Sequence, residues 1–363
     1  MLGRATRALG SLLLVAGLAS GCSGSGDGTV TLTYVSYVPE SNPHSVAHEA
    51  WMAEVEKRTD GAVKFEAIYN GALCDSANIM TCVRDGRADI GIFTPLRHPA
   101  EFPLTNIMSI PFQTTGLQSS LLALRDLYES NDAMRAEFES MNQKLLYFGP
   151  VPAPILGLRT PISSMDDLDG MQFRIPGLMS AAFATLGVSS VTMTEPEIYE
   201  SLDRGVIDGA MTAPDGHESF RTFEVVEQFV DVGRVSGPLA AMTTTMNADR
   251  FNALPQDVQA VINEVSAEFA MSVVPDYFAP SFEATCEVLK SGAPMIDLAP
   301  ADEAKAWAEA ASTGTQQAWL DTLKDANAGV GPQLLDAYHA ALRKYESELT
   351  EDVTFSSRCE ASQ

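Results

Sequence analysis

The sequence predicts an α/β protein with two domains, a ligand cleft between them and a long helix that connects them. Three observations support this fold class. The 363 residues are enough for about two domains, strand and helix patterns alternate in two separate stretches of the chain, and a long, mostly helical stretch follows at 254–292. Because 45% of the residues are hydrophobic and 20% are charged, the composition is that of a globular protein.

The first alternating stretch begins at residue 30. β-Branched and aromatic residues at 30–35 indicate a strand, and the helix expected over 45–58 has Ser41 and Asn42 as polar capping residues. A strand is then expected at 63–68, followed by a helix over about 76–87 and another strand at 89–93. This order predicts a parallel sheet, in which ligands bind at the carboxyl ends of the strands. Those ends are the loops 36–43, 69–73 and 94–99.

The second alternating stretch repeats this arrangement. Strands are expected at 171–175, at 188–193 and from 206 to 210, with helices over 179–186 and 195–203 between them. The helical stretch at 254–292 contains Pro275 and Pro280, which should kink or split it. A strand at 295–298 and two helices within 300–348, separated by residues 329–332, complete the expected elements.

These elements divide the chain into domains. The first α/β domain is expected to comprise 29–150 with about 236–270, and the second 151–235 with about 276–300. A kinked helix over 255–292 would span both, and residues 300–363 would form C-terminal helices and a tail.

The N-terminus has the layout of an export signal. Arg4 and Arg7 precede an apolar run at 12–18, and small residues then lead to Cys22. The segment resembles a bacterial lipoprotein signal, with residues 1–21 removed, Cys22 lipidated and residues 22–28 serving as a flexible tether. Simple secretion is the alternative. We expect an exported protein that is lipid-anchored to the outer face of the cell membrane or lies in the periplasm.

Four further cysteines in an exported chain favour disulfides over free thiols. Three pairings are formally possible. The simplest joins Cys74 to Cys82, which flank only seven residues, and leaves Cys286 to pair with Cys359. Zinc is disfavoured, because neither pair has the two-residue spacing of a zinc knuckle.

The charge balance and the missing motifs exclude several functions. A net charge of −25 disfavours nucleic-acid binding, which depends on clustered cations. Nucleotide-binding, nucleophile-elbow and metalloprotease motifs are absent from the sequence, so we expect no cofactor and no enzymatic activity. His44 and His48 are four residues apart but lack a third ligand, so we expect no metal site. One histidine is expected to line the cleft and the other to lie on the surface.

Arg174 is the most informative single residue. It lies in an otherwise apolar strand and is followed closely by Pro176 and Gly177. A partly buried guanidinium needs a partner, and its planar fork matches a carboxylate. The partner is either an internal Asp or Glu or an anionic ligand.

Several motifs occur in an order that resembles one protein family. They are Glu54–Gly61, Asn70–Leu73, Arg84–Ile90, Ile110–Phe112, Asp167–Gly177, Val206–Ala210 and Leu254–Pro255. From about Thr31 to Leu298 the chain resembles the DctP-type extracytoplasmic solute-binding proteins of tripartite ATP-independent periplasmic (TRAP) transporters. The resemblance implies a periplasmic-binding-protein-like fold whose two domains close over an organic acid. It also implies that the carboxylate-clamping arginine of the family is Arg174.

The remaining site residues follow from this resemblance and its departures. Thr212 stands where the family commonly has an asparagine, and residues 151–154 offer no side-chain donor where many members have one. Arg97 could supply a replacement cation. We expect Arg174 to pair with the ligand carboxylate and Thr212 to hydrogen-bond the rest, with Phe112, His44 and Arg97 lining the cleft. The partners are then a small organic acid and ion-gradient-driven membrane subunits.

Two other functions are alternatives, and the first of them uses the same fold. A ligand sensor could signal to a membrane receptor instead of feeding a transporter. An exported hydrolase or lyase could use carboxylates such as Asp208 and Asp215, but it would need an acid and a base held at reacting distance with different pKa values.

Overall fold

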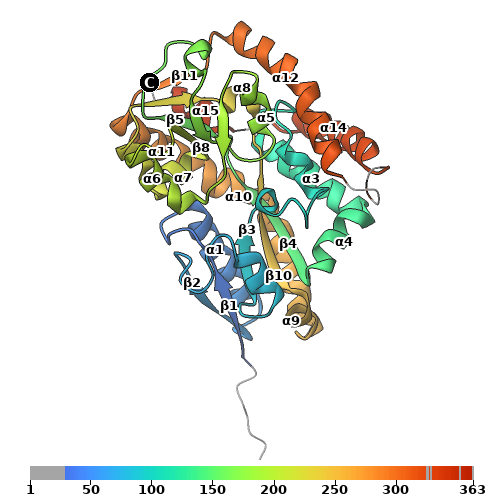
Figure 1. The fold of residues 1–363 in the computed structure, drawn as a ribbon. Coiled ribbons are helices and arrows are strands. Elements are labelled where there is room, and N and C mark those ends of the chain that lie inside the picture. Colours follow the sequence, from blue (N-terminus) through green and yellow to red (C-terminus); the bar gives the residue numbers. More distant parts are fainter. Residues whose placement is uncertain (1–28, 324–326, 328, 351–352, 362–363) are drawn as a thin grey trace, which may run out of the picture.

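Two β-sheets organise the chain, and each lies at the centre of one lobe (Figure 1). The computed structural model describes residues 29–323, 327, 329–350 and 353–361. The predicted signal segment, the tether and Cys22 therefore lie outside the described residues.

The sheet of the first lobe has the strand order β2-β1-β3-β10-β4. Its parallel strands are β1 (Val30–Val35), β2 (Val63–Ile68) and β3 (Ile90–Phe93). Strand β10 (Ala241–Asn247) is antiparallel to both β3 and β4 (Gln143–Pro150). A strand from late in the chain thus completes a sheet that is otherwise built from the first 150 residues.

The first lobe contains the two expected helices, α1 and α2, and three that were not predicted from the sequence. They are α1 (Pro43–Arg58), α2 (Ile79–Arg84), α3 (Leu117–Ser130), α4 (Asp132–Ser140) and α9 (Ala248–Asn252). Asn42 caps α1, as predicted, by accepting a hydrogen bond from the N–H of His44 at 2.9 Å. Helix α2 begins later than predicted, because Asp75 accepts hydrogen bonds from the N–H groups of Ala77 and Asn78 and forms a turn there.

The sheet of the second lobe has the order β11-β9-β5-β8-β6-β7. Its strands are β5 (Ile155–Leu158), β6 (Gln172–Arg174), β7 (Ser189–Val191), β8 (Gly209–Thr212), β9 (Gln228–Asp231) and β11 (Met295–Asp297). Strand β6 is parallel to both β7 and β8, so the carboxyl ends of these three strands point the same way.

The helices of this lobe are short. They are α5 (Met179–Ala184), α6 (Glu195–Asp203), α7 (Pro214–Ser219) and α8 (Gly233–Ser236). Helix α6 has the predicted bounds, and Thr194 and Glu197 form a capping box at its start. This cap fixes where Glu195, the first residue of α6, enters the space between the lobes.

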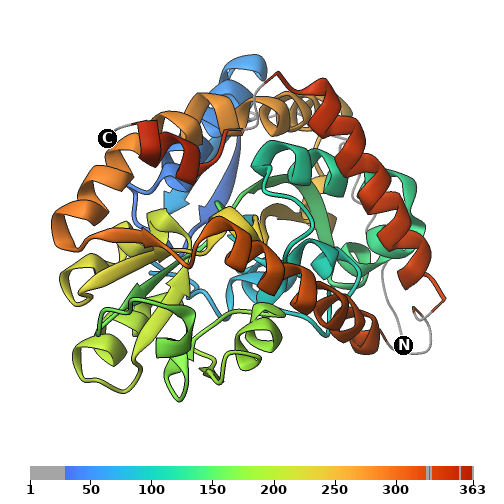
Figure 2. The same ribbon diagram turned by 90° about the horizontal axis from the view of Figure 1, so that it is seen from above.

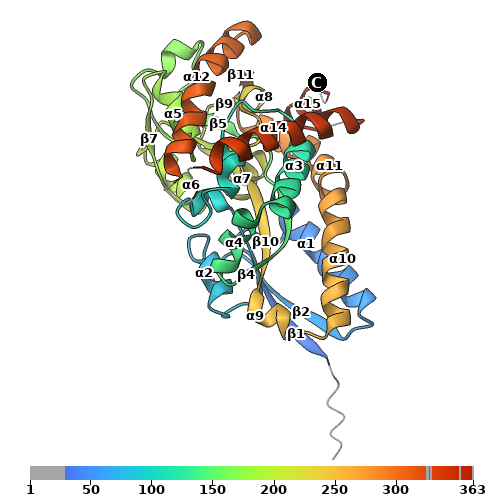
Figure 3. The same ribbon diagram turned by 90° about the vertical axis from the view of Figure 1, so that its right-hand side faces the viewer.

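A broken helix joins the two lobes (Figure 3). It consists of α10 (Gln256–Val273), a π-helical turn (Val274–Phe278) and α11 (Ala279–Gly292). Helix α10 packs against α1 and β4 of the first lobe, whereas α11 packs against α7 of the second. Pro275 lies in the π-helical turn, so the break expected there is confirmed; proline has no N–H to continue an α-helical ladder.

The C-terminal helices also span both lobes (Figure 2). Helix α12 (Ala301–Thr322) packs on α5 of the second lobe, and α14 (Gly331–Glu348) packs on α3 of the first. Helix α15 (Phe355–Ala361) is tied to α11 by the Cys286–Cys359 disulfide, and Cys74 pairs with Cys82. The structure therefore has the simplest of the three disulfide pairings. Within the described residues, no helix combines the length and apolar character needed to cross a bilayer.

Candidate functional site

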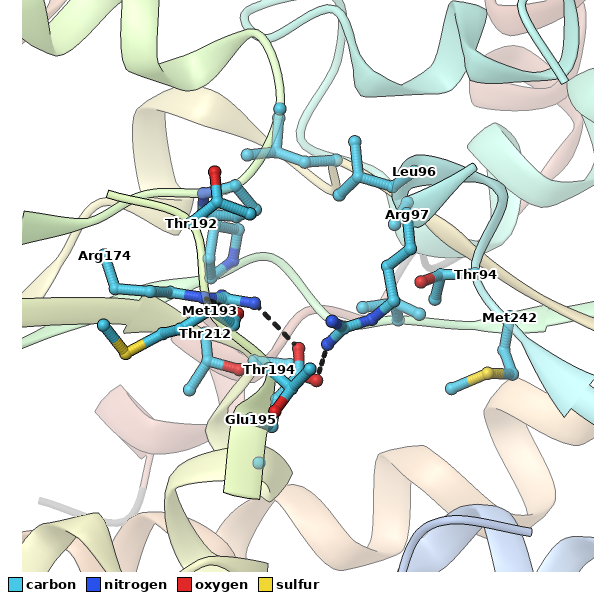
Figure 4. A pocket seen from close by; sticks show the side chains of 18 of the residues that line it. Thr94, Leu96, Arg97, Arg174, Thr192, Met193, Thr194, Glu195, Thr212 and Met242 are labelled. Carbon is cyan, nitrogen blue, oxygen red and sulfur yellow. Dashed lines mark hydrogen bonds and ion pairs between the residues drawn. The ribbon is translucent and has the colours of Figure 1, made fainter. Parts of the chain in front are cut away.

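A cavity of about 850 Å³ lies between the two lobes (Figure 4). From the first lobe it is lined by the segments that follow β1 and β3, and from the second by the ends of β6 and β8 and the segment after β7. Both sheets thus turn the carboxyl ends of their central strands toward the same space, as expected for α/β sheets. The predicted loops 36–43 and 94–99 both contribute lining residues.

The third predicted loop, 69–73, does not line this cavity. It follows β2, which is the edge strand of the first sheet, so its carboxyl end lies away from the sheet centre. Tyr69 donates a hydrogen bond to Glu49 of α1, and the N–H of Gly71 donates to the carbonyl of Ser36. Predicting this loop as part of the site was therefore wrong.

Arg174 is the last residue of β6 and is only 5% exposed. Its Nη1 donates to the carbonyl oxygen of Met211 at 2.6 Å and its Nε to that of Met193 at 3.3 Å. Burial, together with repulsion from Arg97, lowers the pKa of Arg174 to about 9, so the guanidinium stays charged at neutral pH. Two backbone carbonyls thus fix a cation at the cavity wall.

Glu195 lies between two arginines that come from different lobes. Its carboxylate accepts from Nη2 of Arg174 at 3.0 Å and forms an ion pair with Arg97, in the 3₁₀ turn Pro95–Arg97 after β3. Figure 4 shows the two arginine side chains approaching this carboxylate from opposite sides. An internal acid is therefore one partner of Arg174, and the three side chains link the lobes across the cavity.

Thr212, His44 and the segment 151–154 also line the cavity. Thr212, at the end of β8, and His44, in the first turn of α1, both line the cavity and are buried. Burial lowers the pKa of His44 to about 3, so it presents a neutral imidazole. Residues Val151, Pro152 and Pro154 line the cavity without a side-chain donor, as the sequence indicates.

Phe112 lies outside the cavity, so its predicted place in the cleft wall was wrong. Its N–H donates to the carbonyl of Ser236 at 2.9 Å, and its ring packs edge-on against Trp307 of α12 with centroids 5.3 Å apart. These contacts hold the ring at a second cavity of about 640 Å³ beside α12.

The histidine pair has two buried members. His48 contacts the carbonyl of His44, the hydroxyl of Thr244 at 2.8 Å and that of Tyr147 at 2.9 Å. It is 2% exposed, so the expectation that one histidine lies on the surface was wrong. Within the described part of the chain, no group of three or more His, Cys, Asp or Glu side chains could hold a metal ion.

Asp208 and Asp215 lie beyond opposite ends of β8. Asp208 accepts a hydrogen bond from the N–H of Gln172 at 2.8 Å, at the start of β6. Asp215 lines the cavity and accepts a hydrogen bond from Asn42 at 3.1 Å. Because β8 separates them, these two carboxylates do not form the acid and base pair that a hydrolase or lyase would need.

Sequence reasoning missed Tyr37, Asn42 and Glu195 as cavity residues and considered Asp215 only as a catalytic group. Tyr37 and Asn42 lie in a loop that the parallel-sheet rule marks, and Glu195 follows the end of β7 by four residues. Burial raises the pKa of Tyr37. The charges of Arg97 and Arg174 lower this pKa and that of Asp215 raises it, so the hydroxyl of Tyr37 lies near all three charged groups.

Comparison with known proteins identifies the family of the chain. Residues 34–322 match the bacterial extracellular solute-binding proteins of family 7, DctP. A monocarboxylate 2-oxoacid-binding periplasmic protein of Nostoc sp. strain PCC 7120 is 24% identical over 262 residues, which cover 71% of each chain.

Two crystal structures share the fold. A TRAP solute-binding protein from Rhodoferax ferrireducens, in complex with copurified benzoate, has a TM-score of 0.77 at 22% identity, covering 88% of this chain and 99% of that one. The Bordetella pertussis receptor DctP7, which binds pyroglutamic acid, has a TM-score of 0.73 at 22% identity, covering 85% and 99%.

The family match spans both lobes and the broken helix, and the solved structures confirm the predicted two-domain α/β fold. The resemblance noted from the motifs is likewise confirmed. The chain therefore belongs to family 7 of the bacterial extracellular solute-binding proteins, and it is a binding protein, not an enzyme.

Proposed function

We propose that the protein is the extracytoplasmic receptor of a TRAP transporter and captures a small organic acid in the cavity between its lobes. Arg174 pairs with the ligand carboxylate, Thr212 hydrogen-bonds the rest of the ligand, and His44 and Arg97 form part of the wall. The acid then passes to integral-membrane subunits that an ion gradient drives.

The position of the Arg174 guanidinium carries this proposal. Two backbone carbonyls hold Nη1 and Nε, while Nη2 meets the carboxylate of Glu195 at the cavity. A carboxylate oxygen is therefore already accommodated at Nη2, the terminal nitrogen that the backbone carbonyls leave to the cavity, and a bound organic acid would use the same nitrogen. Because the guanidinium is almost fully buried, a ligand carboxylate would pair with it away from bulk water.

The ligands of the relatives support the class of solute. The names of the Nostoc relative and the two solved structures refer to monocarboxylate 2-oxoacids, benzoate and pyroglutamic acid, all of which carry a carboxylate. These proteins differ from one another in the rest of the ligand. Their shared feature is therefore the carboxylate, the group that Arg174 binds in this proposal.

Anchoring through Cys22 is the second part of the proposal. The signal-like segment 1–21 would be removed, and the lipid on Cys22, followed by the tether 22–28, would keep the receptor beside its membrane partners. Mass spectrometry of the mature N-terminus tests this. A Cys22→Ala protein should be released from the membrane, and an unmodified mature N-terminus in the wild type contradicts the anchor.

A thermal-shift screen of organic acids tests the receptor function, because a ligand that binds the folded state raises the melting temperature. The wild type should be stabilised by at least one acid, and Arg174→Ala should lose that shift. Arg204→Ala is the matched control, since Arg204 is an exposed arginine of the same lobe, paired with Glu200 on α6. An Arg174→Ala protein that keeps the wild-type shift contradicts the proposal.

Delivery to a transporter needs a cellular test. Cells that lack this gene should fail to take up the radiolabelled acid identified in the screen, and the wild-type gene should restore uptake where the Arg174→Ala gene does not. Undiminished uptake in the deletion strain would show that the receptor serves another membrane partner.

A further inference from the structure

We infer that Asp215 selects the ligand, so that the cavity takes a small carboxylic acid that also carries an N–H or O–H donor. This inference rests on the proposed function, because it assumes that the carboxylate is bound by Arg174. The inference adds Asp215 as a second recognition group, which accepts a hydrogen bond from the part of the ligand beyond the carboxylate.

Asn42 fixes the orientation of the Asp215 carboxylate. The Oδ1 atom of Asn42 accepts the capping hydrogen bond from the N–H of His44, so its other amide atom must be the nitrogen. That nitrogen donates to Oδ2 of Asp215 at 3.1 Å and to the hydroxyl of Ser219 at 2.9 Å. One carboxylate oxygen of the second lobe is thus held by the first lobe.

The other carboxylate oxygen of Asp215 has no partner in another residue. The side chain lines the cavity and the residue is 9% exposed, yet Oδ1 makes no hydrogen bond to any other residue that the structure describes. The atom is also shielded from bulk water. Buried polar atoms are nearly always hydrogen-bonded, so an unpartnered acceptor at a ligand cavity indicates that the ligand supplies the donor.

The charges around Asp215 favour the same arrangement. Arg174 donates to the carbonyl of Met211, four residues before Asp215, so the carboxylate-binding group and the free acceptor are parts of one wall. Tyr37 lies near the charges of Arg97, Arg174 and Asp215. Burial raises the pKa of Asp215, whereas the hydrogen bonds from Asn42 and from its own backbone N–H lower it, and a further donor would also stabilise the ionised form. An acid without a donor would leave Oδ1 unpaired in the closed cavity.

Isothermal titration of wild-type protein with three matched pairs of acids tests the inference. The pairs are pyroglutamate with 5-oxotetrahydrofuran-2-carboxylate, 3-hydroxybenzoate with benzoate, and mandelate with phenylacetate. Each pair differs by one donor. In at least one pair the donor-bearing acid should bind at least about tenfold more tightly. This comparison needs no variant, so it holds even if a substitution prevents folding.

Asp215→Asn tests whether Asp215 causes the preference. Asn42 would hold the amide oxygen of the new side chain, so its NH₂ group would take the place of Oδ1 and face the ligand as a donor. The preference should shrink or reverse, whereas Asp203→Asn, an exposed Asp on α6, should leave it unchanged.

Three results would overturn the inference. They are equal binding within every pair, tighter binding of the acids that lack the donor, and a preference that persists unchanged in Asp215→Asn. Failure of all six acids to bind is a fourth result that overturns it. The proposed function fails separately, when Arg174→Ala keeps its thermal shift with acids outside these pairs.

Discussion

Glu195 sets the charge of the site at the scale of single residues. Arg97 and Arg174 bring two positive charges to the cavity wall, and the carboxylate of Glu195 contacts both of them. Within this group of three side chains one of the two positive charges is balanced, so the group retains one net positive charge for a ligand. We therefore expect an acid with one carboxylate to bind better than one with two, because the second would remain uncompensated.

Replacing Glu195 tests this charge balance. Glu195→Gln removes the internal anion that competes for Arg174, so binding of benzoate should tighten by about tenfold, or about 1.4 kcal/mol. The gain should be larger for the dianion isophthalate. Isothermal titration measures both, with the exposed Glu200→Gln on α6 as the control. Weaker binding of both acids would instead show that Glu195 positions Arg174 for its ligand.

The sequence identifies Arg174 but not the groups that complete the site. An arginine inside an apolar strand is visible locally, because its burial demands a partner. Glu195 and Asp215 lie in the first turns of short helices and resemble ordinary N-terminal acidic residues until the two lobes are placed against each other. Phe112 shows the opposite error: its motif resembles that of the family, but Trp307, nearly two hundred residues later, holds its ring elsewhere.

At the scale of elements, local patterns predict α6 and the break at Pro275 well. Strand β10 cannot be inferred in the same way, because its place between β3 and β4 depends on pairing with strands that are far apart in sequence. The sequence suggested the first sheet's parallel core but not this antiparallel insertion. Pairing over long separations leaves no local pattern that distinguishes one neighbour from another.

The two disulfides should differ in their contribution to stability. Cys286–Cys359 closes a loop with a sequence separation of 73 residues, and Cys74–Cys82 one of 8 residues. Loop-closure entropy predicts a loss of about 4 kcal/mol for the Cys286→Ala/Cys359→Ala protein and about 2.5 kcal/mol for Cys74→Ala/Cys82→Ala. Urea unfolding measures both losses. An equal or larger loss for the short loop would contradict the entropic account and indicate that packing around Cys82 dominates.

At the scale of the whole molecule, the net charge of −25 opposes the capture of an anion. Salt screens this repulsion beyond about 10 Å, so attraction has to arise at short range. The two sheets provide it by directing the ends of β3 and β6, with Arg97 and Arg174, into one cavity. The arrangement of the lobes therefore brings two of the 23 basic residues, Arg97 and Arg174, together at the ligand cavity.

Buried histidines should make the fold sensitive to acid. Burial lowers the pKa of His44 and His48 to about 3 and that of His217 to about 4. These histidines are protonated in the unfolded chain below pH about 6.5 but stay neutral in the folded protein. Their contribution to the free energy of unfolding is therefore fully present above that pH and is lost as the pH drops. Glu137, whose pKa burial raises to about 7, has the opposite sign and offsets part of the loss.

His217→Asn isolates one of these contributions. His217 contacts the hydroxyl of Thr222 and the carbonyl of Ile155 in the second lobe. The loss of unfolding free energy between pH 7 and pH 5 should be smaller in this variant by about 2 kcal/mol, whatever its stability at pH 7. Urea unfolding at both pH values gives this difference. A wild-type pH dependence in the variant would show that His217 titrates normally in the folded protein.

The central claim is that the Arg174 guanidinium binds the ligand carboxylate. Isothermal titration of an acid found in the screen and its uncharged primary amide, against wild type and Arg174→Ala, tests it most directly, because the cycle isolates the pairwise coupling. We predict that the wild type binds the acid at least about a hundredfold more tightly than the amide, about 2.7 kcal/mol, and that this difference disappears in Arg174→Ala. An acid-to-amide difference that is the same in both proteins would contradict the claim.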